Sequence, residues 1–379
     1  MLRRRTIPVD LLRGVALLGI MMNHVFGATP ESRIWWDFHA IGFALLIGVG
    51  AGLAVPTRGA RRIPMIRALI RAAVLAAIGF TLEMLPNAGI HIILVRFAIV
   101  TALVTLIAGA PRRITPWAAG ILLLAAPLTG WLWQIHDPSA FGAATGWPSA
   151  LHQETWMRML LLPYYPALAW TGVAVIGLWA IRTFRLDRPG SLRSLAGAGL
   201  LLTLTSLAFT WVAWHTIGMP AGVDLRLLAD GEFPTFTHDW RWLLGIGAYL
   251  PTTPSLLLSS GVVLLALALC SWLCLAPSLR AVLTPVATIG AMTLTGYTVH
   301  VLLEGLLQQW AQATTTGQSD NPLAAALAGT GLQPPTGWLS YGVQVALLAV
   351  LLLSWQRLPG RLGRGPLEWL SRTAASVAR

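Results

Sequence analysis

Apolar segments long enough to cross a membrane recur along the whole chain. A helix needs roughly 20 residues to span a hydrocarbon core of ~30 Å. Roughly ten such segments follow one another, and no stretch between them has the composition of a soluble domain. We therefore predict an all-α, polytopic membrane bundle that forms a single domain over residues 1–379. The predicted spans are residues 10–27, 38–56, 65–85, 90–109, 115–134, 160–181, 196–218, 255–276, 284–308 and 338–356.

Charge distribution gives the expected orientation. Only 11% of the residues are charged, against about 25% in a soluble domain. The net charge of +12 comes from 26 basic residues, all of them arginine, and most lie in short connections between apolar segments. This is the positive-inside pattern and not a nucleic-acid-binding surface. We expect a multi-pass protein of a bacterial cytoplasmic membrane with both termini cytoplasmic.

The first apolar segment carries polar groups that lipid penalises. Asp10 and Arg13 are three residues apart and can pair on one helix. His24 lies about three turns beyond Arg13, on the same face and roughly 16 Å further along. Charged groups inside a span cost at least ~2.5 kcal/mol each by insertion scales, so they tend to face a bundle interior or a cavity. The alternative is an interfacial ion pair, with His24 near the outer headgroups.

A second polar group lies near residue 300. Tyr297, His300 and Glu304 are spaced three and four residues apart, which aligns them on one helical face. A carboxylate beside an imidazole suits general-base catalysis near neutral pH, with Glu304 orienting His300. A structural hydrogen-bond network between spans is the alternative. Asp37 and His39 begin the second span and could meet Asn23 and His24 across a short outer connection.

A basic group precedes and enters the third span. Guanidinium groups bind phosphate in bidentate fashion, so this group could hold the phosphates of a nucleotide-bearing cofactor, with Tyr297 expected at the same cofactor. Topology determination and contact with anionic lipid are the alternatives. The histidines do not show the spacing of a zinc protease, and no metal is expected. The arginines concerned are Arg58, Arg61, Arg62, Arg67 and Arg71.

Two of these segments resemble one family. DLLRGVALLGIMMNH, residues 10–24, resembles the first-helix signature of the transmembrane acyltransferase superfamily. This superfamily includes the lysosomal heparan-α-glucosaminide N-acetyltransferase, the bacterial O-antigen and peptidoglycan acetylases and the YeiB-like bacterial membrane proteins. GAMTLTGYTVHVLL, residues 290–303, looks like the C-terminal signature of the YeiB-like branch. Here Ala291 stands where that branch commonly has Arg, and His300 stands where Gln is frequent.

The resemblance implies transfer of an acyl group from cytoplasmic acyl-CoA, with acetyl-CoA the expected co-substrate, to an extracytoplasmic glycan or envelope acceptor. The arginine and histidine of the family's motif carry over to Arg13 and His24, and its basic inner segment carries over to Arg67 and Arg71. CoA phosphates would meet the basic group, and the thioester would reach His24. His24 would act as a general base or as a transient acyl carrier.

Other functions stay open. A proton-coupled transporter or a lipid-linked flippase would also use buried histidines and carboxylates. The apparent lack of Gly/Pro-interrupted half-helices disfavours a transporter. A non-catalytic scaffold is the third possibility. Residues 238–255, HDWRWLLGIGAYLPTTPS, lie in one of three long outer connections (135–159, 219–254 and 309–337) and could form a lid or a sugar-binding surface. The sequence leaves open the acceptor and whether the chain works as a homodimer.

Overall fold

The computed structural model describes residues 7–27, 29, 31, 35, 37–56, 59–85, 89–136, 153–161, 165–220, 239–359 and 362–378. In this part of the chain every regular element is helical. The α-helices are α1 (Ile7–Phe26), α3 (Phe38–Ala54), α4 (Arg62–Glu83), α5 (Leu94–Ala108), α6 (Thr115–His136), α7 (Gln153–Leu161), α8 (Ala167–Thr183), α9 (Pro189–Thr216), α11 (Thr253–Leu273), α12 (Pro277–Ala291), α13 (Thr293–Thr316), α14 (Pro322–Gly329), α15 (Gly337–Trp355) and α16 (Pro366–Ala375). Short 3₁₀ turns are η1 (Arg112–Ile114), η4 (Trp240–Leu244) and η5 (Leu362–Arg364).

Each of the ten predicted segments contains a helix in the described part of the chain, but their number as membrane spans is not confirmed. Within the described residues, six helices are long and apolar enough to cross a membrane, or seven if the bent pair α12–α13 counts as one span. The helices α3, α5 and α8 are apolar but shorter, at 17, 15 and 17 residues. The fold is thus an all-helical bundle of a multi-pass membrane protein.

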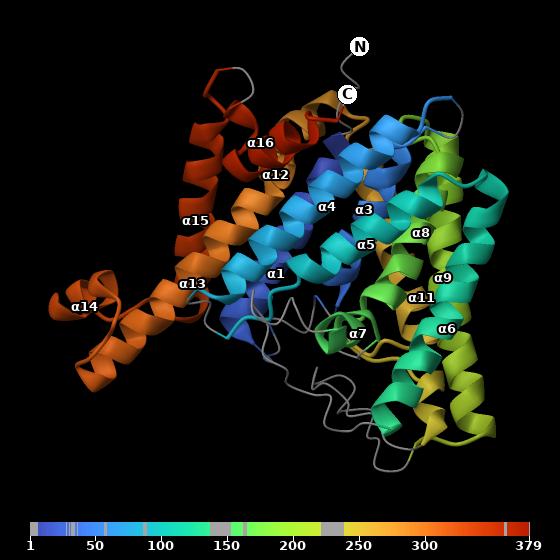
Figure 1. Ribbon diagram of the computed structural model, residues 1–379, viewed down its shortest axis with the longest axis horizontal. Coiled ribbons are helices and arrows are strands. Elements are labelled where there is room, and N and C mark those ends of the chain that lie inside the picture. Colours follow the sequence, from blue (N-terminus) through green and yellow to red (C-terminus); the bar gives the residue numbers. More distant parts are fainter. Residues whose placement is uncertain are drawn as a thin grey trace.

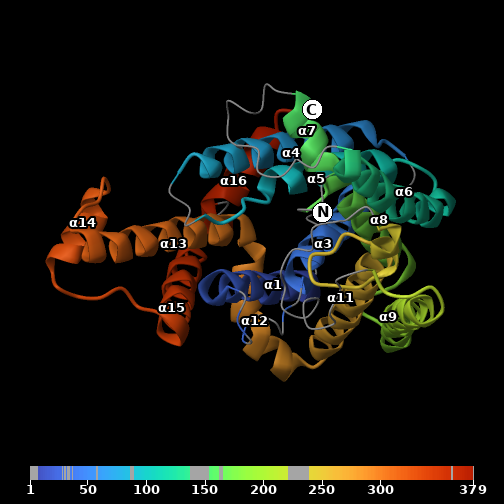
Figure 2. The same cartoon turned by 90° about the horizontal axis from the view of Figure 1, so that it is seen from below.

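α1 lies in the middle of the bundle. It packs against α3, α11, α12, α13 and α15, whereas α4 and α5, which cross over it in the view of Figure 1, lie apart from it in Figure 2. Small residues allow the helices to approach closely, as is common in membrane bundles. A Cβ atom at Gly290 of α12 would overlap the carbonyl group of Asp10 in α1. The C-terminal half of α13 and α14 extend away from this bundle (Figure 2).

The predicted span over residues 284–308 is not one straight helix, because the helix breaks at Met292. α12 and α13 meet there at a bend of 72°. Met292 has φ −119° and ψ 35°, which is not helical. The Glu368 carboxylate from α16 accepts hydrogen bonds from the backbone N–H groups of Leu294 and Thr295, at 2.8 and 3.2 Å. A neighbouring helix therefore satisfies the backbone groups that the break exposes, which is how membrane helices tolerate such interruptions.

The break also changes two other expectations. The argument that the chain lacks interrupted helices does not hold, since α12–α13 is such a pair. The predicted loop 309–337 is largely helical, because α13 continues to Thr316 and α14 follows. α13 ends at Gly317, whose φ of 72° suits a glycine that terminates a helix.

Candidate active site

His24 and His300 are hydrogen-bonded to each other. His24 lies in the last turn of α1, and His300 lies in α13. The distance from His24 Nδ1 to His300 Nε2 is 2.9 Å. The ring planes differ by 7° and the ring centres are 5.2 Å apart, as expected for two imidazoles joined edge to edge. The two polar groups predicted separately from the sequence therefore meet, and His300 is only 1% exposed.

A buried amide continues the chain of hydrogen bonds. Gln344 of α15 accepts a hydrogen bond from His300 Nδ1 at 2.8 Å through its side-chain oxygen. Its side-chain nitrogen donates to a Glu304 carboxylate oxygen at 2.5 Å and to Ser340 Oγ at 3.2 Å. Glu304 thus lies against Gln344, and it orients His300 through this amide and not by direct contact. Sequence reasoning missed Gln344, although a single amide in an otherwise largely apolar helix is a signal of hydrogen bonding to another helix.

This chain fixes the tautomer of both imidazoles when they are neutral. An ionised Glu304 only accepts hydrogen bonds, so the Gln344 nitrogen faces Glu304 and the Gln344 oxygen faces His300. His300 must then carry its proton on Nδ1, which leaves Nε2 as the acceptor. His24 donates from Nδ1, and its Nε2 keeps a lone pair. The arrangement therefore prepares His24 Nε2 to take a proton.

A second hydrogen-bond chain lies beside the first. Asn23 Nδ2 donates to Tyr249 Oη at 2.7 Å, so the Tyr249 hydroxyl donates to His39 Nε2 at 3.1 Å. Burial raises the pKa of Tyr249 well above its usual value and keeps this hydroxyl protonated. Residues 238–255, predicted as an outer lid, thus supply Tyr249 to the interior. The expected neighbours Asn23 and His39 are bridged by Tyr249, and Asp37 accepts a hydrogen bond from Ser259 at 2.6 Å.

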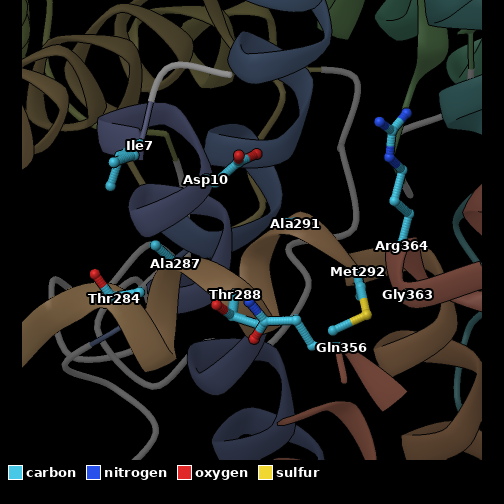
Figure 3. Close-up of a pocket in the computed structure, with 10 residues that line it drawn as sticks. All are labelled: Ile7, Asp10, Thr284, Ala287, Thr288, Ala291, Met292, Gln356, Gly363 and Arg364. Carbon is cyan, nitrogen blue, oxygen red and sulfur yellow. The ribbon is translucent and has the colours of Figure 1, made fainter. Parts of the chain in front are cut away.

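Asp10 and Arg13 form the predicted ion pair at the other end of α1. Arg13 Nη1 and Asp10 Oδ1 are 3.2 Å apart. Asp10 is 7% exposed and lines a cavity of about 210 Å³ beside the α12–α13 break (Figure 3). Thr288, Gln356 and Arg364 also line this cavity. The pair thus lies at the helix break, well away from the two histidines along α1.

The described arginines of the predicted basic group differ in their contacts. Arg58 lies outside the described residues. Arg67 donates to the Ala378 carbonyl at 3.2 and 3.1 Å, while Arg62 and Arg71 are exposed on α4. Arg61 hydrogen-bonds to the Gly109 carbonyl at the end of α5.

Arg61 is grouped instead with arginines that sequence reasoning assigned to topology. Arg182 of α8 is within electrostatic range of Arg61 and Arg112. Arg182 Nη2 donates to the Ala108 carbonyl at 2.7 Å. Its Nε and Nη1 atoms are buried and have no hydrogen-bond partner among the described residues. Unpartnered guanidinium donors beside two like charges form a site suited to an anion.

Tyr297, predicted at the cofactor, is 5% exposed and lies one turn before His300 on α13. Its hydroxyl group is buried, with no partner in the described part of the chain. No three His, Cys, Asp or Glu side chains in that part gather as metal ligands would.

No protein-family model matches the sequence, and no curated protein matches it.

Proposed function

We propose that this chain is a transmembrane acyltransferase of a bacterial cytoplasmic membrane. It moves an acetyl group from cytoplasmic acetyl-CoA to a hydroxyl or amine of an extracytoplasmic sugar or envelope acceptor. The observation that carries the proposal is the hydrogen-bond chain from His24 through His300 and Gln344 to Glu304. A base oriented by a second group, which is oriented by a third, is the usual arrangement for activating a nucleophile.

The hydrogen-bond chain suggests how the protons move. His24 Nε2 takes the proton of the acceptor O–H or N–H while the acceptor atom attacks the thioester carbonyl carbon. The tetrahedral intermediate then collapses, the C–S bond breaks, and the CoA sulfur leaves with the electron pair. The proton on His24 Nε2 passes to this sulfur, which restores neutral His24. No oxidant, metal or further reactant is needed for this balance.

His300 would share the charge that His24 acquires. When His24 is protonated, the proton on its Nδ1 can move along the 2.9 Å hydrogen bond to His300 Nε2. The next group is the Gln344 amide, which does not accept a proton at this pH. The charge therefore stays on the two imidazoles, and the Glu304 carboxylate stabilises it from one residue further away. This limited relay stabilises the protonated pair better than a lone buried histidine would be stabilised.

Arg61, Arg112 and Arg182 are the groups we expect to meet the CoA phosphates. Their mutual repulsion and the two unpartnered Arg182 nitrogens both favour a bound anion. This differs from the site expected from sequence, where Arg67 and Arg71 were the leading candidates. Arg67 already holds the C-terminal segment through the Ala378 carbonyl.

The direct test is release of CoA thiol by purified protein given acetyl-CoA and a panel of sugar acceptors. His24→Gln should lower kcat by about 10²- to 10⁴-fold, the usual contribution of general-base catalysis. His215→Gln is the matched control, because His215 is exposed and bonds only to its own helix in the described chain, at the Trp211 carbonyl. Equal rates for the His24 variant and wild type would exclude His24 as the base.

Proton-coupled transport is the second candidate, and the α12–α13 break favours it. Interrupted helices line many transporter sites, and His300 lies on the second half of this pair. This reading predicts substrate uptake into vesicles that depends on a proton gradient and proceeds without thioester cleavage. Thioester cleavage that depends on His24, without gradient-driven uptake, would decide for the enzyme.

A further inference from the structure

A group of buried donors lies next to the histidine pair and has no role in the chemistry above. Arg96 is in the first turn of α5, and its Nε atom is buried without a hydrogen-bond partner among the described residues. The Tyr297 Oη atom is also buried without a hydrogen-bond partner among the described residues. Arg96 lies within electrostatic range of Tyr297, Tyr165 and Glu83. Native proteins rarely leave buried donors unpaired, so this group lacks an acceptor.

The position of these donors connects them to His24. Tyr297 and His300 are three residues apart on α13 and share a face. His91 is within electrostatic range of both His24 and Arg96. Tyr297 thus places the Arg96 group at the face of α13 that carries His300, and His91 lies within electrostatic range of both parts.

The backbone near this group is strained. Tyr165 and Tyr249 are the two non-glycine residues with positive φ in the described chain, at 58° and 57°. Their rings contact each other edge to face, with centres 5.7 Å apart. Strained residues persist where the surrounding structure holds them, and they concentrate at ligand sites. Tyr165 lies within electrostatic range of Arg96, and Tyr249 accepts a hydrogen bond from Asn23, so the two tyrosines connect this group to the end of α1.

We propose that Arg96 and Tyr297 bind a carboxylate group of the acyl acceptor and thereby place its hydroxyl or amine at His24 Nε2. The placement of the hydroxyl or amine at His24 Nε2 rests on the proposed acyltransferase function. A guanidinium edge and a phenol hydroxyl are donors only toward such a group, and a carboxylate accepts from both. Glu83 is close enough to offset part of the Arg96 charge, so the site balances a monoanion better than a phosphate dianion.

The other reading is that Arg96 and Glu83 form a solvent-bridged structural pair. That reading predicts no dependence of substrate preference on Arg96. The two readings therefore differ in acceptor selectivity and not merely in activity or stability.

The test compares two acceptors that differ only in the anionic group, methyl β-D-glucuronide and methyl β-D-glucoside. CoA thiol release from acetyl-CoA gives KM and kcat for each, with purified wild type. We expect KM for the glucuronide to be about 10- to 100-fold lower than for the glucoside, the usual contribution of hydrogen bonds to a charged group. Arg96→Gln should remove this preference by raising KM for the glucuronide to about the value for the glucoside.

Two further variants keep the result interpretable. Tyr297→Phe removes only the hydroxyl and should reduce the preference in the same direction, so it decides the matter if Arg96→Gln fails to fold. Arg241→Gln is the matched control, because Arg241 pairs with Asp239 at 2.6 Å on η4. It should keep the wild-type preference.

Binding of the glucuronide is also measured by calorimetry without acetyl-CoA. Binding that Arg96→Gln weakens, in protein that releases no CoA, would support the carboxylate site and count against the acyltransferase. Equal KM values for the two acceptors in wild type would overturn the proposal. So would a preference that survives Arg96→Gln, a preference that Tyr297→Phe does not reduce, or the absence of both glucuronide binding and glucuronide turnover.

Discussion

Replacing Gln344 with methionine tests whether the amide sets the tautomers of the two histidines. Methionine has a similar length, but its thioether is a weak hydrogen-bond acceptor for His300 Nδ1 and has no hydrogen to donate to Glu304. Two hydrogen bonds, of 2.8 and 2.5 Å, are therefore lost. His300 is then free to carry its proton on either nitrogen. Where that proton lies on Nε2, His24 meets a donor in place of an acceptor.

Stability and rate should both fall. Hydrogen bonds between membrane helices average about 0.6 kcal/mol and reach about 1.7 kcal/mol, so two bonds should cost about 1–3 kcal/mol of stability. The rate should fall by about 10²-fold, which corresponds to about 2.7 kcal/mol in the activation barrier. The rate falls because the fixed proton position on His300 and the fixed orientation of its ring are lost together.

Glu304→Gln is the control for this variant. The amide that this substitution introduces can still accept from the Gln344 nitrogen through its own side-chain oxygen, so the orientation of Gln344 is kept while the charge is removed. We expect a loss below about tenfold in kcat. The assay is CoA thiol release, with the unfolding temperature measured on the same preparations. If Gln344→Met keeps kcat within about threefold of wild type, or if Glu304→Gln costs as much, orientation by the amide is refuted.

Three further variants test the other parts of the molecule. Arg182→Ala should weaken CoA binding about tenfold by calorimetry, with a smaller salt dependence than wild type, since one phosphate contact is lost. Burial raises the pKa of Glu368, so folding favours its protonated form. That contribution to stability is complete below the unfolded pKa of about 4.3 and is lost as pH rises through the higher folded pKa, and Glu368→Gln should flatten this part of the stability curve over pH. Gly290→Ala should lower the unfolding temperature, because its Cβ overlaps α1 and overpacking costs about 1–3 kcal/mol, whereas Gly342→Ala in open space on α15 should not.

The sequence determined the class of fold. Apolar segments of spanning length leave helices as the favoured structure, because lipid offers no partner for free backbone groups. Every predicted segment is helical within one or two turns of its predicted ends, apart from the start of α8 and the interrupted segment at Met292. The helical spacing in α1 also predicted the ion pair between Asp10 and Arg13. It placed His24 on the same face, and the structure shows that His24 contacts His300 of α13.

Only the tertiary structure decided which distant groups meet. His24 and His300 are 276 residues apart, and Gln344 joins from a third helix. Periodicity orders residues along one helix and says nothing about the partner helix or the angle between them. The break at Met292 was hidden for a related reason. It is supported by Glu368, 73 residues from Thr295, so no local sequence signal records it.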